Sequence, residues 1–236
     1  MRSVFISGVA GGFGGAIAAA LAADGMAIFG SDTHASEEIC RTDVTDEAQV
    51  KAAFDQAEAL NGPVSVLVTC AGIMPSGTES VRIPDMTVEE WDSVFAVNTR
   101  GTFLCLREFL RRREQAPLHG ATAVLMSSAA AQLGGYRGSA SYVASKAALL
   151  GLTKIAAREG AAYGVTVNCV AAGPVRTPML EAATTPESVA ALSARIPLGK
   201  IGTTDDIAAA VLYLVSPGAR WVTGTTMDVN GGYRMQ

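Results

Sequence analysis

The side chains best suited to acid–base chemistry in this sequence are Tyr142 and Lys146. They stand at positions i and i+4 of a segment with helical spacing, so both project from one helical face. A nearby ammonium favours the phenolate, and we therefore expect the pKa of Tyr142 to lie below its ordinary value of about 10. Such a tyrosine suits proton transfer near neutral pH. Taken alone, the pair equally fits an exposed tyrosine and a solvated lysine.

A serine hydroxyl is expected at the same place. Ser128 ends an apolar strand predicted over residues 121–126, and a loop rich in glycine and serine leads from it into the helix that carries Tyr142. The hydroxyl of Ser128 can point at the same place as the side chains of Tyr142 and Lys146. Ser127, its neighbour, stays an alternative.

A glycine-rich turn lies near the start of the chain. Residues 7–15 connect a short apolar strand to an alanine-rich helix, and a second strand follows with Asp32 just past its end. Glycines there let the backbone approach a pyrophosphate, and the start of the helix supplies free N–H groups. Asp32, 24 residues after Gly8, is placed to accept hydrogen bonds from an adenosine ribose.

Charge predicts which dinucleotide binds. Asp32 would repel a 2′-phosphate, and the turn holds no lysine or arginine. Like charges in close contact cost several kcal/mol. We therefore expect NAD(H) rather than NADP(H). His34 and the more distant Arg41 are the nearby groups that could weaken this expectation.

Strands alternate with helices along the whole chain. Residues 33–43 are too short for a full crossover helix, so the third strand must lie within residues 40–44. The other strands are expected at residues 2–7, 26–30, 63–68, 121–126, 165–170 and 225–229, and the helices at 16–23, from 45, 87–111, 139–163 and 204–214. The pattern predicts one α/β domain over residues 1–236, a Rossmann-like doubly wound parallel sheet of about seven strands. Prolines interrupt residues 178–199, which we expect to be a mobile segment of irregular helix over the substrate.

Two polar residues, Asp43 and Asn98, each allow two interpretations of their role. Asp43 is either a ligand for the adenine amino group or the residue that precedes the next helix. Asn98 lies among apolar neighbours in the middle of a predicted helix, which a capping box at residues 87–90 opens. It is either a satisfied core amide or the site of a helix distortion that holds a water for proton relay.

Composition excludes several other classes of function. The 236 residues include no apolar run long enough for a membrane helix, and the first residues lack the pattern of a signal peptide. Four separated cysteines indicate reduced thiols and a cytoplasmic protein, and two histidines are too few for a zinc site, so no metal is expected. The net charge is −4, and the basic cluster at residues 111–113 is best read as a solvated helix end. We expect neither a nucleic-acid nor a membrane partner.

Taken together and in this order, these motifs resemble the short-chain dehydrogenase/reductase family over nearly the whole chain. The family's TGxxxGxG turn is matched by residues 7–14, DVT by 43–45, NNAG by 69–72, its helix asparagine by Asn98, its serine by Ser128, YxxxK by 142–146, and N-x-V-x-PG by 168–173, with its threonine at Thr177. Ser7 replaces the first threonine, Thr69 and Cys70 replace the paired asparagines, and Ala172 replaces proline. Ser128 precedes Tyr142 by one position more than is common, which a loop insertion around residues 134–135 would absorb.

The resemblance implies a mechanism and a set of site residues. Tyr142 would exchange a proton with the substrate oxygen during hydride transfer, Lys146 would lower its pKa and bind the nicotinamide ribose, and Ser128 would donate a hydrogen bond to the same oxygen. Asn98 would hold the relay water, and Val175 and Thr177 would grip the carboxamide. The implied cofactor-binding residues are Gly8, Gly12, Phe13, Gly14, Asp32, Asp43, Val44, Ala71, Gly72, Tyr142, Lys146, Gly173, Val175 and Thr177.

The expected substrate is a secondary alcohol or ketone, small or cyclic. Residues 195–202 and the short region 33–43 look like those of 2,3-dihydro-2,3-dihydroxybenzoate dehydrogenases. The rival enzyme is an NADPH-dependent 3-oxoacyl-[acyl-carrier-protein] reductase, for which Arg100, Arg107 and residues 111–113 could supply a basic docking patch. A dinucleotide-binding protein without catalysis is the alternative outside enzymes. The resemblance also implies a homo-oligomer, a tetramer or a dimer.

Overall fold

Parallel strands form the centre of the fold. The computed structural model describes residues 1–75, 81–134, 139–182 and 184–235. Within these residues one seven-stranded sheet runs in the order β3 (Ile39–Arg41), β2 (Ala27–Asp32), β1 (Ser3–Ser7), β4 (Val64–Thr69), β5 (Ala121–Ser128), β6 (Val165–Ala172) and β7 (Thr226–Val229). Every neighbouring pair is parallel. The predicted doubly wound sheet is therefore confirmed.

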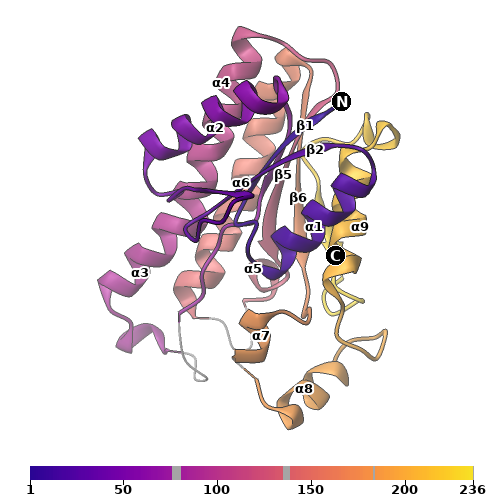
Figure 1. Ribbon diagram of the computed structural model, residues 1–236. Helices are drawn as coiled ribbons and strands as arrows, with labels where there is room; N and C mark the ends of the chain where they lie inside the picture. Colours follow the sequence, from indigo (N-terminus) through magenta and orange to yellow (C-terminus); the bar gives the residue numbers. More distant parts are fainter. Residues whose placement is uncertain (76–80, 135–138, 183, 236) are drawn as a thin grey trace.

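Helices cover both faces of this sheet (Figure 1). One face carries α2 (Glu47–Asn61), α4 (Thr102–Gln115) and α6 (Ala140–Gly160), and the other carries α1 (Gly12–Ala23) and α9 (Thr204–Val215). Shorter helices are α3 (Val88–Phe95), α5 (Ala130–Leu133), α7 (Pro178–Ala182) and α8 (Pro186–Ser193), with 3-10 turns at Ile83–Asp85, Ala161–Tyr163 and Pro217–Ala219. All residues of β1 and β4 are buried, as expected for central strands covered on both sides. Phe5 stacks on Phe54 with ring centroids 4.1 Å apart, which fixes α2 against the sheet.

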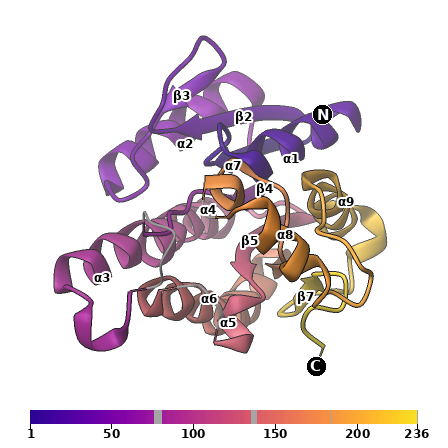
Figure 2. The same cartoon turned by 90° about the horizontal axis from the view of Figure 1, so that it is seen from below.

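The strand order reverses between β1 and β4, and the carboxyl ends of these two strands lie close together. A Cβ atom placed on Gly8, just after β1, would lie 2.4 Å from the backbone nitrogen of Ala71, just after β4. Open α/β sheets bind their ligands at such a switch point. Seen from this end, α7 and α8 lie across the carboxyl ends of the strands (Figure 2).

Three details of the sequence reading need correction. The third strand spans Ile39–Arg41, so it begins one residue before the predicted range of 40–44 and ends before Asp43. The amide of Thr42 donates to the carbonyl of Asp32, and the chain then turns. The helix predicted over residues 87–111 is divided into α3, a π-helical segment at Ala96–Gly101 and α4. The last helix is capped by Thr203, whose hydroxyl accepts from the amide of Asp206, rather than by residue 204.

Candidate functional site

A cavity of about 400 Å³ opens at the switch point between β1 and β4. Of the predicted site residues, it is lined by Gly8, Asp32, Asp43, Val44, Ala71 and Gly72. The sequence reading did not place Ala10, Gly11, Thr33, Thr42, Cys70, Ile73 and Val97 in the binding site, and it noted His34 only for its charge; all eight line the cavity too. The cavity thus joins the carboxyl ends of four strands, β1, β2, β3 and β4.

The glycine turn forms a cradle that side chains cannot enter. Gly8 has a φ of +72°, and a Cβ atom on Gly14 would lie 2.2 Å from the carbonyl oxygen of Gly8. Helix α1 begins directly after Gly11, which gives it no side-chain cap. Free N–H groups at a helix start, with no side chain in the way, suit the pyrophosphate of a dinucleotide. The turn therefore fits the cofactor that the sequence predicts.

Asp32 lies at the far end of this cavity. Its Oδ2 accepts from the amide of Ala10 at 3.1 Å, and its Oδ1 accepts from the hydroxyl of Thr33 at 3.3 Å. The Nδ1 of His34 lies 3.7 Å from Oδ1, and its side chain is 91% exposed. Asp32 keeps 15% of its side chain exposed, so its carboxylate faces the cavity and can accept further hydrogen bonds.

Asp43 and Val44 line the same end of the cavity. The Oδ1 of Asp43 accepts from both the amide and the hydroxyl of Thr45, at 2.9 and 2.8 Å. Asp46, not Asp43, caps α2 by accepting from the amides of residues 48 and 49. Asp43 thus shapes the loop before α2 and also borders the cavity. Its contact with the adenine amino group stays a prediction.

Ser128 lies beside Tyr142, and Lys146 lies beside Gly72 at the edge of the cavity. The side chains of Ser128 and Tyr142 are hydrogen-bonded. The Nζ of Lys146 donates to the carbonyl of Met126 at 2.9 Å, and a Cβ atom on Gly72 would lie 3.2 Å from that Nζ. Gly72 borders the cavity, so Lys146 adjoins it.

Ser127 and Ser128 have different roles in this structure. The hydroxyl of Ser127 is buried and donates to the carbonyl of Lys146 at 2.8 Å, which ties β5 to α6. Of these two serines, only Ser128 interacts with the phenol of Tyr142. The hydroxyl of Ser128 also accepts from the amide of Ala130 at 3.1 Å. Ser128 is therefore the better placed of the two for contact with a substrate.

The prediction that Lys146 lowers the pKa of Tyr142 below its ordinary value is wrong for the protein without cofactor. Burial raises the pKa of Tyr142, and the hydrogen bond to Ser128 lowers it by a smaller amount. Burial also lowers the pKa of Lys146 to about 8, with Cys169 and Cys70 close enough to act against that change. The ammonium donates to the carbonyl of Met126, and its charge does not offset the burial of the phenol.

Asn98 lies in the π-helical segment and is fully buried. Its Nδ2 donates to the carbonyl of Ile73 at 2.9 Å and to the hydroxyl of Ser145 at 3.0 Å, and its Oδ1 accepts from the amide of Ile73 at 2.8 Å. The predicted helix distortion and the satisfied core amide therefore occur together at Asn98. Single π-helical turns are frequent at functional sites. The side chain ties the loop after β4 to α6 and so positions the helix that carries Tyr142.

The remaining predicted cofactor residues lie beside the start of α1 and the end of β6. A Cβ atom on Gly12 would lie 3.2 Å from Cγ2 of Thr177, so the segment after β6 touches the glycine turn. Val175 is buried and Gly173 follows β6 directly. The side chain of Phe13 packs on the apolar cluster between α1 and α9, which leaves its main chain for any contact with a cofactor.

Comparison with known proteins shows which family the chain resembles. A family model described as enoyl-(acyl carrier protein) reductase matches residues 8–234. An NADPH-dependent aldehyde reductase-like chloroplastic protein of Arabidopsis thaliana is 40% identical over 196 residues, which are 83% of this chain and 71% of the relative. A 3-oxoacyl-[acyl-carrier-protein] reductase of Staphylococcus aureus is 35% identical and covers 99% of this chain and 98% of its own. A solved short-chain dehydrogenase/reductase from Serratia marcescens superposes with a TM-score of 0.88 at 28% identity, over 98% of this chain and 97% of the other.

This chain belongs to the short-chain dehydrogenase/reductase family. Its departures from the family's motifs are accommodated locally. The amide of Cys70, which replaces an asparagine of the family's pattern, donates to the carbonyl of Ser7 at 2.9 Å and keeps β1 and β4 tied. Burial raises the pKa of its thiol to about 12, so Cys70 is neutral. The carbonyl of Ala172, at the altered proline position, accepts from the amide of Ala129 at 2.8 Å.

The sequence reading overlooked Ser145 and Ile73. Ser145 lies in the YxxxK segment, and its hydroxyl donates to the carbonyl of Tyr142 at 2.8 Å while accepting from Asn98. A serine between the two catalytic positions was the available signal, but its partner is 47 residues away in sequence. The loop insertion suggested for residues 134–135 lies partly outside the described residues, of which Gly134 is included with a φ of +82°. Within the described residues, no cluster of side chains suited to a metal ion occurs.

Proposed function

We propose that this family member is an NAD(H)-dependent oxidoreductase that acts on a small or cyclic secondary alcohol or ketone. The observation that carries the proposal is the arrangement around one cavity. Asp32 borders one end, the glycine cradle lies between, and Lys146, with Ser128 and Tyr142, adjoins the other end. A dehydrogenase needs an acceptor for the adenosine ribose and an anion site for the pyrophosphate of its cofactor, and an acid–base site for its substrate.

The preference for NAD(H) rests on charge around the ribose position. Asp32 faces the cavity, and Asp43 borders the same end, where a 2′-phosphate would meet two carboxylates. His34 and Arg41 are the basic groups nearby; Arg41 pairs with Asp32 in the register of β2 and β3. The Arabidopsis relative is named for NADPH, so this preference distinguishes the present chain from it.

The roles of the residues follow from their contacts. The bound nicotinamide supplies or accepts the hydride. Tyr142 then gives a proton to the substrate oxygen or takes one from it, and Ser128 donates a hydrogen bond to that oxygen as its charge changes. Lys146 would bind the nicotinamide ribose. Asn98 holds the loop after β4 and the helix that carries Tyr142 in place around them.

The raised pKa of Tyr142 suits carbonyl reduction. Its phenol stays protonated at neutral pH, which is the acid form that a carbonyl needs. Reduction should therefore proceed at neutral pH and fall as the phenol loses its proton at alkaline pH. Oxidation of the alcohol needs the phenolate and should rise over the same range.

The carrier-protein reductase is the second candidate, because the relative from Staphylococcus aureus has that name. Its basic docking patch has little support here. Arg107 and Arg111 pair with Glu47, and Arg112 and Arg113 pair with Glu58. Arg112 also pairs with Asp55 and Glu108, so these four arginines contact four carboxylates. Arginines whose charge is already balanced within the chain attract an acidic carrier protein weakly. Reduction of 3-oxoacyl groups with NADPH in preference to simple ketones with NADH would favour this candidate.

The role of Tyr142 is tested with Tyr142→Phe. The variant should bind NADH like the original protein but lose turnover of cyclic and linear ketones, followed by the loss of NADH absorbance. Unchanged turnover would remove Tyr142 from the mechanism. NADH binding without any turnover in the original protein, across ketones and alcohols, would support the non-catalytic alternative.

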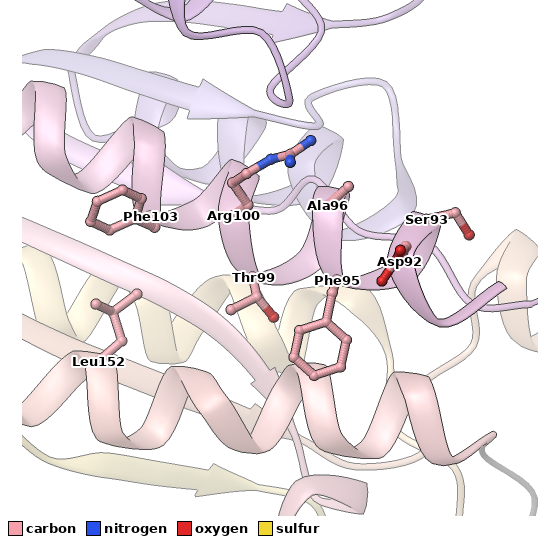
Figure 3. A pocket seen from close by; sticks show the side chains of 8 residues that line it. All are labelled: Asp92, Ser93, Phe95, Ala96, Thr99, Arg100, Phe103 and Leu152. Carbon is pink, nitrogen blue, oxygen red and sulfur yellow. The ribbon is translucent and has the colours of Figure 1, made fainter. Parts of the chain in front are cut away.

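A homo-oligomer is part of this proposal. A cavity of about 810 Å³ lies between α3, the π-helical segment and α6, and is lined by Asp92, Ser93, Phe95, Ala96, Thr99, Arg100, Phe103 and Leu152 (Figure 3). Phe103 is 41% exposed and Ile155 on α6 is 50% exposed. Exposed apolar surface with an acid and a base at its edge suits a second copy of the chain, in which Asp92 can face Arg100.

The described residues include no helix long and apolar enough to cross a membrane. All four cysteines are free thiols, which supports the reducing cytoplasm as the compartment.

A further inference from the structure

The chain ends in a braced turn after β7. The amide of Gly232 donates to Oδ1 of Asn230 at 3.0 Å, and Nδ2 of Asn230 donates to the carbonyl of Arg234 at 3.1 Å. Arg234 in turn forms an ion pair of 2.8 Å with Asp228 on β7. We call residues 230–234 the C-terminal turn. These contacts hold the turn together and attach it to β7.

The C-terminal turn packs on the end of β6. The amide of Gly173 donates to the carbonyl of Val229 at 2.9 Å, and a Cβ atom on Gly173 would lie 2.5 Å from Cβ of Asn230. Gly173 begins the segment that runs through Val175 to Thr177 beside the glycine turn. The C-terminal turn is therefore fixed relative to the proposed nicotinamide end of the site.

The opposite side of the C-terminal turn holds the residues that follow α8. The amide of Leu198 donates to the carbonyl of Gly231 at 3.1 Å. A Cβ atom on Gly231 would lie 2.7 Å from Cγ2 of Ile196, and one on Gly232 would lie 3.0 Å from Cγ of Pro197. Ile196 is only 3% exposed, so this contact is close-packed.

Helix α8 itself packs loosely on the rest of the protein. None of its eight residues is buried. Farther along the chain, two hydrogen bonds of 3.0 Å join Gly202 to the segment before α7, through the amide of Arg176 and the carbonyl of Pro174. A helix that buries no residue is positioned by the segments that flank it.

From these contacts we infer that the C-terminal turn positions α8 over the carboxyl ends of the strands, with Gly231 and Gly232 as positioning residues for substrate binding. Both glycines have positive φ values, +65° and +85°, and any side chain there would push the residues after α8 away. The effect on substrate rests on the proposed function, whereas the effect on α8 does not. Loosening the turn should raise KM for a ketone more than it lowers kcat.

Gly231→Ala tests this inference, with Gly25→Ala as its matched control. Gly25 also has a positive φ, +80°, but a Cβ atom there would meet nothing within 4 Å. Both substitutions carry the same backbone strain, and only Gly231→Ala disturbs the contact with Ile196. Hydrogen–deuterium exchange in residues 184–199 should speed up about tenfold in Gly231→Ala and stay unchanged in Gly25→Ala. KM for a ketone should rise by about the same factor, with NADH affinity and kcat within about twofold.

Ile196→Ala removes the same contact from the other side and keeps both glycines, so it replaces Gly231→Ala if that variant does not fold. Equal exchange of residues 184–199 in the variant, the control and the original protein would overturn the inference. So would faster exchange with an unchanged KM. Failure of the original protein to bind NADH would instead overturn the proposed function, since the exchange measurement needs neither cofactor nor turnover.

Discussion

Lys146 should make the protein without cofactor less stable at neutral than at alkaline pH. Burial lowers its pKa from 10.5 to about 8. Between these two values the unfolded chain binds more protons than the folded chain, so the free energy of unfolding rises with pH. Below pH 8 the lysine is charged in both the folded and the unfolded state, so the destabilisation caused by burying its charge is constant. Above pH 10.5 the lysine is neutral in both states, and this destabilisation has disappeared.

The size of the effect follows from the same two values. One pKa unit corresponds to about 1.4 kcal/mol, so burial of the ammonium destabilises the folded state by about 3 kcal/mol at pH 7 and about 2 kcal/mol at pH 9. Lys146→Met removes this dependence on pH. It also removes the hydrogen bond to the carbonyl of Met126, a loss of about 1 kcal/mol that does not vary with pH. Between pH 7 and pH 9 the free energy of unfolding of the original protein should therefore rise by about 1 kcal/mol more than that of the variant.

Urea unfolding of both proteins at the two pH values, without NADH, measures this gain. The buried thiols of Cys70, Cys105 and Cys169 also have raised pKa values, but they are common to both proteins and largely cancel in the comparison. Lys154→Met is the control, because Lys154 is exposed on the same helix. An equal difference in stability at both pH values, or a relative loss by the original protein at pH 9, would refute the reasoning.

Other changes give equally definite expectations. Asn98→Ala should lower the free energy of unfolding by about 3 kcal/mol, because it leaves both backbone groups of Ile73 without their side-chain partner; a loss below about 1 kcal/mol in urea unfolding would contradict this. Gly14→Ala should abolish NADH binding, measured by fluorescence, since its Cβ would lie 2.2 Å from a carbonyl oxygen of the glycine turn; binding at the original affinity would show that the turn has room to move. Asp32→Asn should raise the affinity for NADPH relative to NADH by about tenfold or more, and an unchanged ratio would argue against the charge effect. Phe103→Asp should shift the protein toward the monomer in sedimentation, and an unchanged mass would exclude this face as the interface.

Local sequence patterns predicted the sheet and the positions of the motifs well. The strands β1 and β4 read as continuous apolar runs because both of their faces are buried. The gap of only a few residues before the third strand showed that no crossover helix fits there, and the structure has none between β2 and β3. The glycines of the first turn could be assigned because close backbone approach excludes every other residue type.

Contacts between distant segments could not be read from the sequence. The partners of Asn98 lie 25 and 47 residues away, and its local surroundings show only that the helix is distorted. The pKa of Tyr142 depends on how deeply the phenol is buried and on where the ammonium of Lys146 points, and neither follows from a spacing of four residues. The same holds for the contact between Gly231 and Ile196, which only the folded chain brings together.

The most direct test of the account is a titration of the purified protein with NADH and, separately, with NADPH, followed by fluorescence. Repulsion between Asp32 and a 2′-phosphate predicts NADH binding at least about tenfold tighter than NADPH binding. Tighter binding of NADPH would contradict the charge argument and favour the carrier-protein reductase. Binding of neither would contradict the proposed oxidoreductase itself.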